Sequence, residues 1–339
     1  MPTKPTLLAM LGAGRSSQQL AGALVQSAGM TLVAVADPIP ARRSQVIAQH
    51  AGAREFATFE ELLSVGVYDA AVISLPNDLL VPATLAALKK GLHVLTELPC
   101  ARNPKELKQI AKAQASSGKV VMPAMLRRLG PFELSARAAI AKGLIGQVKH
   151  VRLSHTRTRG VPAGTGWYED ASRAGGGALL DLGLPLLDLA LHLLGPSAPT
   201  RAFATRLFVE AQQAKVEHAA SALVQLGEQT QIEMSVAWQL NQPPQQQGMI
   251  ARFHGTLGCL DLYTRDGAVV WRGFDGRAPP KLAKLQQPKL HGLALLARQF
   301  KDAMTGKTPT PSVVDELGPA HAVVEACYAS IASGKAQAV

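Results

Sequence analysis

A glycine pair near the amino terminus stands where a dinucleotide-binding chain needs it. Gly12-Ala13-Gly14 comes directly after the apolar run 6–11 and directly before a segment with helical periodicity, 15–26. Such glycines let the backbone pass close to a pyrophosphate, which rests on the amides at the positive end of the following helix. Asp37 closes the next apolar run, where an acidic side chain would hold the adenosine ribose. The candidate cofactor-binding residues at this turn are Gly12, Gly14, Arg15, Ser16 and Asp37.

Three neighbouring residues bear on the form of the nucleotide. Ser17 takes the position of the fingerprint's third glycine, which loses some close packing but adds a hydroxyl that could reach a phosphate. Arg42 and Arg43 follow Asp37 and could hold a 2′-phosphate, whereas the carboxylate itself would repel one. We therefore expect NAD or NADP, with NAD favoured, and add Arg42 to the cofactor-binding candidates.

The segments around these residues alternate between strand and helix patterns. Strand patterns lie at 7–11, 32–36, 70–74, 93–96 and 120–122, and helix patterns at 15–28, 41–50, 81–90 and 104–117. Such alternation favours a parallel sheet with helices on both faces. We predict an α/β chain that opens with an NAD(P)-binding Rossmann domain over residues 1–125.

The pattern changes after a helix expected at 131–142. Further strand patterns lie at 148–155, 200–209, 219–226, 231–239, 249–254, 259–263 and 269–272. Gly227-Glu228 and Asp266-Gly267 fit hairpin turns between them. We predict an α+β substrate and oligomerisation domain over 126–312, with a large, mostly antiparallel sheet that has one face on helices and the other free for a partner. A C-terminal helix and tail follow over 313–339.

Composition excludes several classes of protein. The 339 residues exceed what one compact core usually holds, and 47% of them are apolar, so two domains are expected. The net charge is +11, but aromatic residues make up only 4%, which argues against nucleic-acid binding by stacking. Three widely spaced cysteines are typical of reduced cytoplasmic thiols, and we expect no metal site. The apolar helix pattern at 179–194 contains Asp181 and Asp188 and is too short to span a bilayer, so we expect no membrane segment.

Four segments, read in order, resemble the glucose-fructose oxidoreductase / inositol dehydrogenase / rhizopine catabolism (Gfo/Idh/MocA) family. They are the glycine turn, Leu75-Pro76-Asn77, Glu97-Leu98-Pro99 and the run GGGALLDLG at 175–183; the tail residues Glu325, Ala326, Tyr328, Ser330 and Gly334 are also similar to that family's closing helix. The resemblance implies a Rossmann domain, a second open-sheet domain, NAD or NADP held between them, and a homodimer or homotetramer formed through the open sheet. It adds Leu75, Pro76, Asn77, Glu97 and Pro99 to the cofactor-binding candidates.

The chain departs from the family pattern at three polar positions. Leu98 stands where the family usually has its acid-base lysine, Pro185 where a histidine commonly shares the proton relay with Asp181, and Leu80 where another histidine is common. A positioned general acid or base contributes about 10²–10⁴ in rate, whereas the hydride comes from the nicotinamide. These losses argue against oxidation of a sugar hydroxyl, and less against reduction of an acceptor that takes its proton from water.

The remaining polar residues supply candidates for catalysis and substrate binding. The catalytic candidates are Glu97, Asp181, His155 and Tyr168, and the substrate-binding candidates are Arg127, Arg128, Arg157 and Trp167. Asp188 lies two helical turns beyond Asp181 and is expected to form a structural cap or ion pair. His155, Arg157 and Arg159 alternate along one strand, as in a cationic stripe or an exposed sheet face. Four of the candidates also fit a structural role. Arg127 and Arg128 could be a solvated charge pair, and Trp167 and Tyr168 could pack in the core.

Two classes of function fit this pattern. One is a cytoplasmic NAD(P)-dependent oxidoreductase that transfers a hydride between nicotinamide and a small anionic or carbonyl-bearing substrate without the usual lysine. A variant of it is a reductase similar to biliverdin reductases, which carry the fold without the lysine. The other class is a catalytically silent dinucleotide sensor or regulatory protein. A structural dimer module would require that no cofactor binds.

Overall fold

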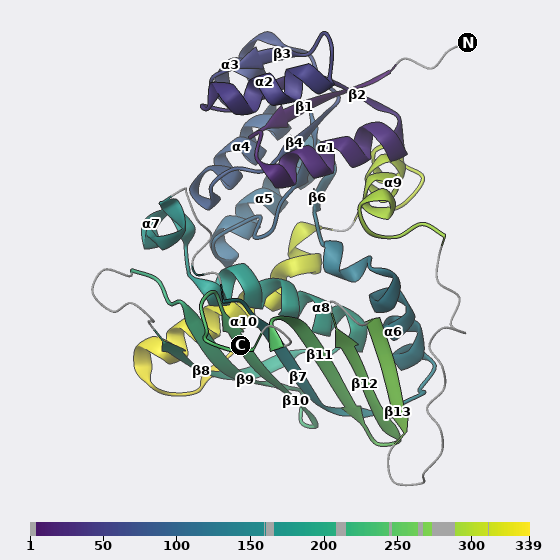
Figure 1. Cartoon of the computed structure of the whole chain (residues 1–339), viewed down its shortest axis with the longest axis vertical. Helices are drawn as coiled ribbons and strands as arrows, with labels where there is room; N and C mark the ends of the chain where they lie inside the picture. The colour runs from purple at the N-terminus through teal and green to yellow at the C-terminus, as the bar shows by residue number, and fades with distance from the viewer. Residues whose placement is uncertain are drawn as a thin grey trace. The chain divides into compact units, whose positions relative to one another are not determined.

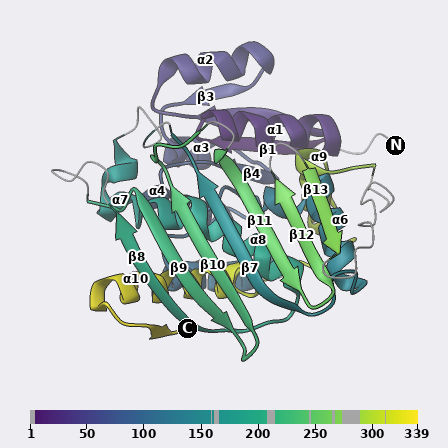
Figure 2. The same ribbon diagram turned by 60° about the horizontal axis from the view of Figure 1, so that its bottom comes forward.

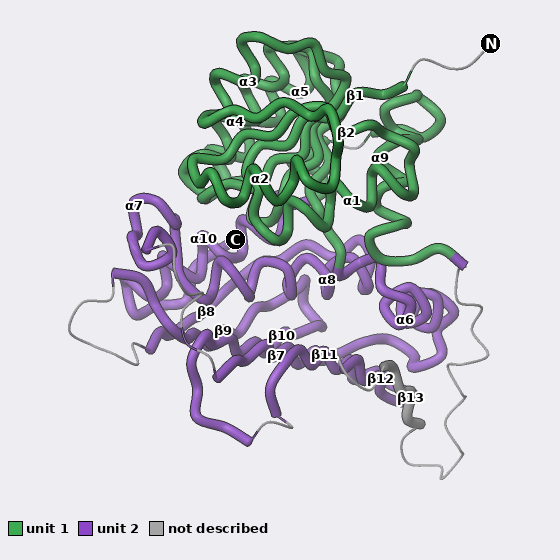
Figure 3. The backbone as a smooth tube through the Cα atoms, turned by 45° about the horizontal axis from the view of Figure 1, so that its top comes forward, with its two compact units in different colours: residues 1–126, 290–316 green, residues 127–289, 317–339 purple. Residues whose placement is uncertain are grey.

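The computed structural model describes residues 5–158, 160, 166–207, 215–243, 246–263, 267–272, 289–310 and 312–339. The chain forms two compact units, shown in different colours in Figure 3. Unit 1 comprises residues 1–126 and 290–316, and unit 2 comprises residues 127–289 and 317–339. Residues 290–312 thus group with the first unit, whereas the sequence analysis placed them in the second domain.

Unit 1 is built on a six-stranded parallel sheet in the order β3-β2-β1-β4-β5-β6 (Figure 1). Its strands are β1 Thr6–Leu11, β2 Met30–Ala36, β3 Arg54–Phe56, β4 Ala70–Ile73, β5 His93–Thr96 and β6 Val121–Pro123. Its helices are α1 Arg15–Ala28, α2 Pro40–Gln49, α3 Phe59–Val65, α4 Asn77–Lys89, α5 Pro104–Ser117 and α9 Gly292–Met304. This strand order confirms the predicted Rossmann domain.

Local chemistry fixes where these elements begin and end. All four residues of β4 are buried, as expected for a central strand of a parallel sheet. Gly29 and Gly118 end α1 and α5 in the left-handed conformation, which glycine adopts without strain. Asn103 begins α5, because its side chain accepts a 3.0 Å hydrogen bond from the amide of Glu106. The glycine turn at 12–14 lies between the end of β1 and the start of α1.

Unit 2 contains an eight-stranded sheet in the order β13-β12-β11-β7-β10-β9-β8-β14, seen across its strands in Figure 2. The strands are β7 Val148–Thr156, β8 Pro199–Leu207, β9 Ala219–Leu226, β10 Thr230–Ala237, β11 Gly248–Gly255, β12 Gly258–Tyr263, β13 Gly267–Arg272 and β14 Gln337–Ala338. Only the β7–β10 pair is parallel among these pairings, which confirms a mostly antiparallel sheet. The hairpin turn at Gly227-Glu228 joins β9 to β10, and Asp266 of the other expected turn lies outside the described residues.

Helices cover one face of this sheet. They are α6 Pro131–Ala141, α8 Leu184–Leu194 and α10 Val313–Ser333, together with the short segment η3 Leu179–Gly183. The chain also forms the short helical segments η1 Leu126–Arg128, η2 Trp167–Glu169 and α7 Ala171–Ala174. Alternate strand residues such as Leu153 and Met234 enter the core that these helices complete. Their neighbours Arg152 and Glu233 point to the opposite face, where they form an ion pair. The alternation confirms the predicted two-faced sheet.

The helical stretch Ala171–Leu194 of unit 2 is long and apolar. Its most apolar window has a mean hydropathy of 1.6, so that by length and composition alone it could cross a membrane. However, 72% of that window is buried inside the structure, as in the core helix of a water-soluble domain. Asp181 and Asp188 lie within the same stretch and have partners in unit 2.

Candidate functional site

The turn after β1 needs glycine at its first position. Gly12 has a φ of +87°, and a methyl group added there would lie 2.0 Å from the carbonyl oxygen of Ser74. Its amide donates a 2.8 Å hydrogen bond to the carbonyl of Ala36 at the end of β2. Gly12 therefore lets three neighbouring strands come together at the point where α1 begins.

Gly14 has no such internal reason to be glycine. Its φ is −66°, which any residue adopts, and apart from its two chain neighbours no atom of the described residues lies within 4 Å of where a methyl group would stand. Gly14 is the N-cap of α1, and the first turn of that helix contains no acidic residue. The amides of a first helical turn lack partners within their helix, so the open space over Gly14 faces donors that suit an anion. The residues present therefore fit the pyrophosphate of a dinucleotide.

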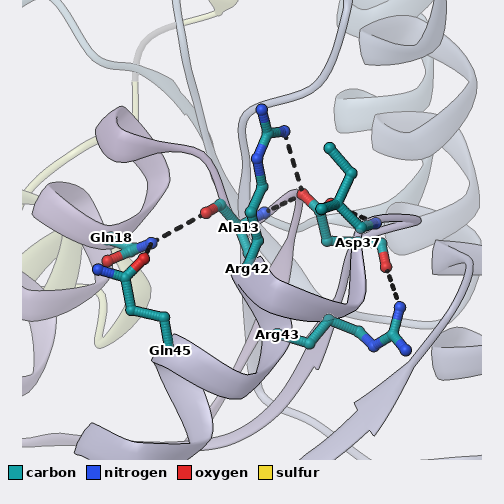
Figure 4. A network of polar contacts seen from close by, with 7 residues as sticks. Ala13, Gln18, Asp37, Arg42, Arg43 and Gln45 are labelled. Carbon is teal, nitrogen blue, oxygen red and sulfur yellow. Dashed lines mark hydrogen bonds and ion pairs between the residues drawn. The ribbon is translucent and has the colours of Figure 1, made fainter.

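A cavity of about 390 Å³ opens beside this turn in unit 1. Its lining residues are Ala13, Gly14, Arg15, Gln18, Gln19, Arg42 and Gln45. Figure 4 shows Gln18 and Gln45 pointing toward each other, with a 3.4 Å contact from the Gln18 amide nitrogen to the Gln45 amide oxygen. Two guanidinium groups and three amides make this a donor-rich cavity, and it has no carboxylate in its lining.

Asp37 is tied to the glycine turn. Its Oδ2 accepts a 2.8 Å hydrogen bond from the amide of Ala13, and its Oδ1 accepts one of 2.9 Å from the amide of Ile39 (Figure 4). The residue is only 4% exposed, whereas the Arg42 side chain, 3.8 Å away, is 42% exposed. Arg43 donates to the Asp37 carbonyl and pairs with Glu55. The carboxylate thus holds the turn in place, and its contact with a ribose stays a prediction.

Ser16 and Glu97, from separate segments of unit 1, are brought together by the fold. The Ser16 hydroxyl donates to the Glu97 carboxylate. Burial raises the pKa of Glu97, while the bonds from Ser16 and from the amide of Leu98 act against the rise. The predicted cofactor residues at the start of α1 and after β5 therefore form one polar group.

The expectation for Ser17 is wrong. Its side chain is fully buried, and its hydroxyl has no hydrogen-bond partner among the described residues. Ser17 lies on the face of α1 that packs on the sheet, so its hydroxyl does not point toward a phosphate. The residue fills the place of the small third glycine of the fingerprint.

The other family-like segments of unit 1 lie at strand ends. Leu75 and Pro76 follow β4 and are half-buried, and Asn77 begins α4 with 9% of its surface exposed. Pro99 follows β5 and is buried, whereas Leu98 beside it is half-buried. Carboxyl ends of parallel strands are where ligands bind in open α/β sheets.

In unit 2 the glycine run at 175–177 is explained by close packing. A methyl group on Gly176 would lie 2.1 Å from the Tyr328 hydroxyl oxygen, and one on Gly177 would lie 2.0 Å from the carbonyl oxygen of Glu217. The buried Glu217 carboxylate accepts hydrogen bonds from the amides of Gly177 and Leu179 and from the Tyr328 hydroxyl. This network fixes the start of η3, which carries Asp181.

Asp181 accepts a 2.7 Å hydrogen bond at Oδ2 from Nε1 of Trp238, and Nη1 of Arg157 lies 3.8 Å from the same oxygen. Burial raises the pKa of Asp181, and the Trp238 bond and the charges of Arg157 and Arg127 act against the rise. An acid whose pKa is raised holds its proton to a higher pH, which suits a proton donor.

Arg127 and His155 lie side by side. Nη2 of Arg127 is 3.2 Å from Nδ1 of His155, and Nη1 is 2.9 Å from the sulfur of Met249. Burial, followed by the charges of Arg127 and Arg157, lowers the pKa of His155 to about 3. The imidazole is therefore neutral near pH 7, with its Nδ1 lone pair directed at Arg127, which disfavours it as the acid. Arg159 of the expected stripe lies outside the described residues.

Aromatic rings connect the segment before the glycine run to Asp181. Trp167 and Tyr168 stack with ring centroids 3.9 Å apart, and Tyr168 meets the edge of Trp238 with a centroid distance of 6.2 Å. Tyr168 also packs against the core of unit 2. Tyr168 thus packs at the edge of the core, as one alternative expected. It also contacts the indole that is hydrogen-bonded to Asp181, which keeps its catalytic role as a prediction.

Arg128 lies in a different environment from Arg127. Its guanidinium binds the Asp188 carboxylate through Nε, at 2.9 Å, and through Nη2. Asp188 is 2% exposed, and it forms the ion pair that the sequence suggested. The role of Arg128 in substrate binding stays a prediction, and this ion pair does not support it.

Three residues of this cluster were missed by the sequence analysis. Trp238 directly follows β10, Met249 lies on β11, and Glu217 precedes β9. Met249 could have been found only from the register that places it opposite His155. A tryptophan directly after a strand that contains no other aromatic residue was the one local signal for Trp238.

Two family models match most of the chain. The model "Oxidoreductase family, NAD-binding Rossmann fold" matches residues 7–125, and the "GFO/IDH/MocA C-terminal domain" matches residues 134–261. The chain belongs to the Gfo/Idh/MocA family. Its members bind NAD on the Rossmann domain that unit 1 contains.

Curated members of this family are similar over part of the chain. A putative UDP-kanosamine synthase oxidoreductase subunit from Amycolatopsis mediterranei is 35% identical over 57% of this chain and 53% of its own length. D-glucoside 3-dehydrogenase from Escherichia coli is 26% identical over 58% of this chain and 56% of its own length. The chain thus spans about half the length of the curated relatives it matches.

Solved structures of Gfo/Idh/MocA proteins share the whole fold. The WlbA dehydrogenase from Bordetella pertussis, in complex with NADH and UDP-GlcNAcA, has a TM-score of 0.85 at 21% identity and covers 100% of this chain and 99% of its own. Aldose-aldose oxidoreductase from Caulobacter crescentus has a TM-score of 0.83 at 22% identity and covers 99% of this chain and 100% of its own. At these identities the likeness establishes the fold alone.

Proposed function

We propose that this chain is an NAD(P)-dependent oxidoreductase that moves a hydride between nicotinamide and a small, carbonyl-bearing, sugar-like substrate. The observation that carries the proposal is Gly14, a glycine that neither its backbone angles nor its neighbours require. Room left over the first turn of α1 suits a pyrophosphate. Sugar dehydrogenases and reductases among the relatives support the substrate class.

Unit 1 would hold the dinucleotide through residues of one connected group. The amides of the α1 first turn would bind the pyrophosphate, and Arg42, half-exposed in the adjacent cavity, would contact the adenosine side of the molecule. Glu97, which directly follows β5 and is hydrogen-bonded to Ser16, would help to hold the cofactor there. The nicotinamide, when bound, supplies or accepts the hydride.

Unit 2 would supply the proton and the substrate contacts. Asp181 is the best-placed donor, because burial raises its pKa while Trp238 and Arg157 keep its carboxyl oriented. His155 is held neutral as an acceptor for Arg127. The side chains of Leu98 and Pro185 have no titratable group. Asp181 would therefore act without the lysine and the histidine that the family usually has at these positions. Such a site favours reduction of a carbonyl over oxidation of an alcohol.

Titration with NADH and with NADPH, followed by nicotinamide fluorescence, tests this proposal. We expect saturable binding of at least one of them. A panel of aldehydes, imines, keto-sugars and linear tetrapyrroles, incubated with the bound nucleotide, then identifies turnover. Failure of both nucleotides to bind would contradict the proposal; turnover confined to tetrapyrroles would favour the relation to biliverdin reductases.

A second candidate function is a dinucleotide sensor that binds cofactor without turning it over. The apolar side chains at three family catalytic positions, Leu80, Leu98 and Pro185, favour it. It predicts tight nucleotide binding together with no cofactor oxidation by any member of the panel. The oxidoreductase proposal predicts that at least one carbonyl compound oxidises the bound NADH or NADPH.

A further inference from the structure

We propose that the substrate carries a carboxylate and that Arg127 binds it. This inference rests on the proposed function, because it names the substrate class of the same site. It starts from Arg127 of unit 2, which among the described residues has no carboxylate within ion-pair distance.

The contacts of Arg127 differ from those of three other arginines. Arg102, Arg128 and Arg252 each bind a carboxylate through two nitrogens. Within the described part of the chain, the hydrogen-bond contacts of Arg127 are with the sulfur of Met249 and Nδ1 of a neutral His155. A guanidinium presents five N–H donors, so two weak neutral acceptors leave a fork that fits a carboxylate.

Burial makes this arrangement costly unless an anion joins it. Burial lowers the pKa of Arg127; the charges of Glu133 and Asp181 oppose the shift, and that of Arg157 adds to it. Neither acid forms an ion pair with Arg127 in the described structure, and the pKa values of both acids are themselves raised by burial. A buried cation is stable when it is paired and hydrogen-bonded. A bound carboxylate would supply both conditions.

The neighbours of Arg127 narrow the choice of ligand. Arg157 lies near the same place and contacts Asp181, whose Oδ2 already accepts from Trp238. A second guanidinium adds positive charge without blocking the Arg127 fork. Planar, two-point binding of a carboxylate by arginine gives direction as well as affinity, which a neutral hydroxyl does not match. The ligand class that fits is therefore a sugar acid or a related hydroxy- or keto-acid.

Binding measurements on the full chain test this inference. Isothermal titration with D-glucuronate, D-galacturonate and D-gluconate, each in the presence of saturating NADH, is compared with D-glucose, D-galactose and the methyl ester of glucuronate. We expect at least one acid to bind about 10- to 100-fold more tightly than its neutral counterpart, the range typical of hydrogen bonds to a charged group.

Variants assign the effect to one residue. Arg127→Gln should remove the preference for the acid, and Arg127→Lys should restore only part of it, because lysine keeps the charge but lacks the fork. Arg152→Gln, on the opposite face of the sheet, should bind the acid as the natural chain does. Near-ultraviolet circular dichroism of the tryptophans shows whether each variant has kept its fold.

The outcomes separate this inference from the proposed function. If NADH binds but no acid binds more tightly than its neutral counterpart, the inference is wrong and the oxidoreductase proposal stands. An acid preference that survives in a folded Arg127→Gln variant would also overturn it. If neither NADH nor NADPH binds, both proposals fail; if only NADPH binds, the acids are compared in its presence instead.

Discussion

Nε1 of Trp238 donates a 2.7 Å hydrogen bond to Oδ2 of Asp181 across 57 residues of sequence. The indole is fully buried, so the bond holds the carboxylate in one orientation. It also decides how far the pKa of Asp181 rises, since burial raises the pKa and this bond is the largest influence that lowers it. The orientation and the pKa of the Asp181 carboxylate therefore depend on Trp238.

Replacing Trp238 by phenylalanine should raise the pKa of Asp181 further. The lost bond favoured the charged carboxylate, so its removal leaves the effect of burial less opposed. A carboxyl ¹³C titration by NMR measures the shift directly, and a double-mutant cycle with Asp181→Ala should give a coupling of about 1.5–3 kcal/mol in the free energy of unfolding. An unchanged or lowered pKa would show that the indole does not stabilise the charged form.

Substitution of Gly176 by alanine should destabilise unit 2, because the new methyl group would crowd both the Tyr328 hydroxyl oxygen and, at 2.8 Å, the ring carbon that bears it. The new methyl group would lie 2.1 Å from the Tyr328 hydroxyl oxygen, and overpacking of this kind costs about 1–3 kcal/mol. Tyr328→Phe removes that oxygen, together with its hydrogen bond to Glu217. Denaturant unfolding should therefore show the double variant to be less destabilised than the sum of the single variants. Strict additivity would mean that the clash is relieved elsewhere.

The protein should lose stability as the pH falls from about 6.5 to 4. Burial and the charge of Lys119 lower the pKa of His93 to about 4, although Asp69 opposes the shift. The native state then binds fewer protons than the unfolded state between the two pKa values, so this contribution is complete above pH 6.5 and is lost on acidification. Nδ1 of His93 accepts from the amide of Val120, a role that asparagine can retain. His93→Asn should thus give a flatter profile of Tm against pH, and a profile parallel to that of the natural chain would refute this assignment.

Restoring lysine at Leu98 together with histidine at Pro185 should produce measurable NAD-dependent oxidation of sugar alcohols. The rate should rise by roughly 10²-fold or more over the natural chain, because a positioned general base supplies that much. Leu98→Met together with Pro185→Ala is the matched control without a titratable group. If the variant binds the nucleotide but gains no oxidation activity, the substrate pocket has changed in more than the loss of its lysine and histidine.

The sequence predicted unit 1 well because its signals are local. Fully buried strands such as β4 give continuous apolar runs, and α1 and α5 have glycine stops and, for α5, a capping asparagine. The strand β3 was missed because it has three residues, two of them exposed. The helix α9 packs against α1, more than 250 residues earlier, and no local pattern predicts that partner.

The candidate site was predictable only where its residues are neighbours in sequence. The glycine turn and Asp37 follow from one strand-helix-strand pattern, whereas the direction of Ser17 depends on the rotation of α1 against the sheet. In unit 2 the contacts depend on strand register. His155 meets Met249 because β7 and β11 pair at those positions, and Arg127 then reaches both side chains.

The most direct test of the account compares two glycines of the same helix. Gly14→Ala and Gly22→Ala each place a methyl group where, apart from adjacent residues and the backbone of α1, no atom of the described chain lies within 4 Å, so both variants should fold. Dissociation constants for NADH and NADPH, measured by nicotinamide fluorescence, should rise at least about tenfold for Gly14→Ala, since the methyl group would occupy the approach of the pyrophosphate. Gly22→Ala should bind as the natural chain does and should be more stable by about 1 kcal/mol. Unaltered binding of both nucleotides by a folded Gly14→Ala variant would contradict the central claim that the dinucleotide lies over the first turn of α1.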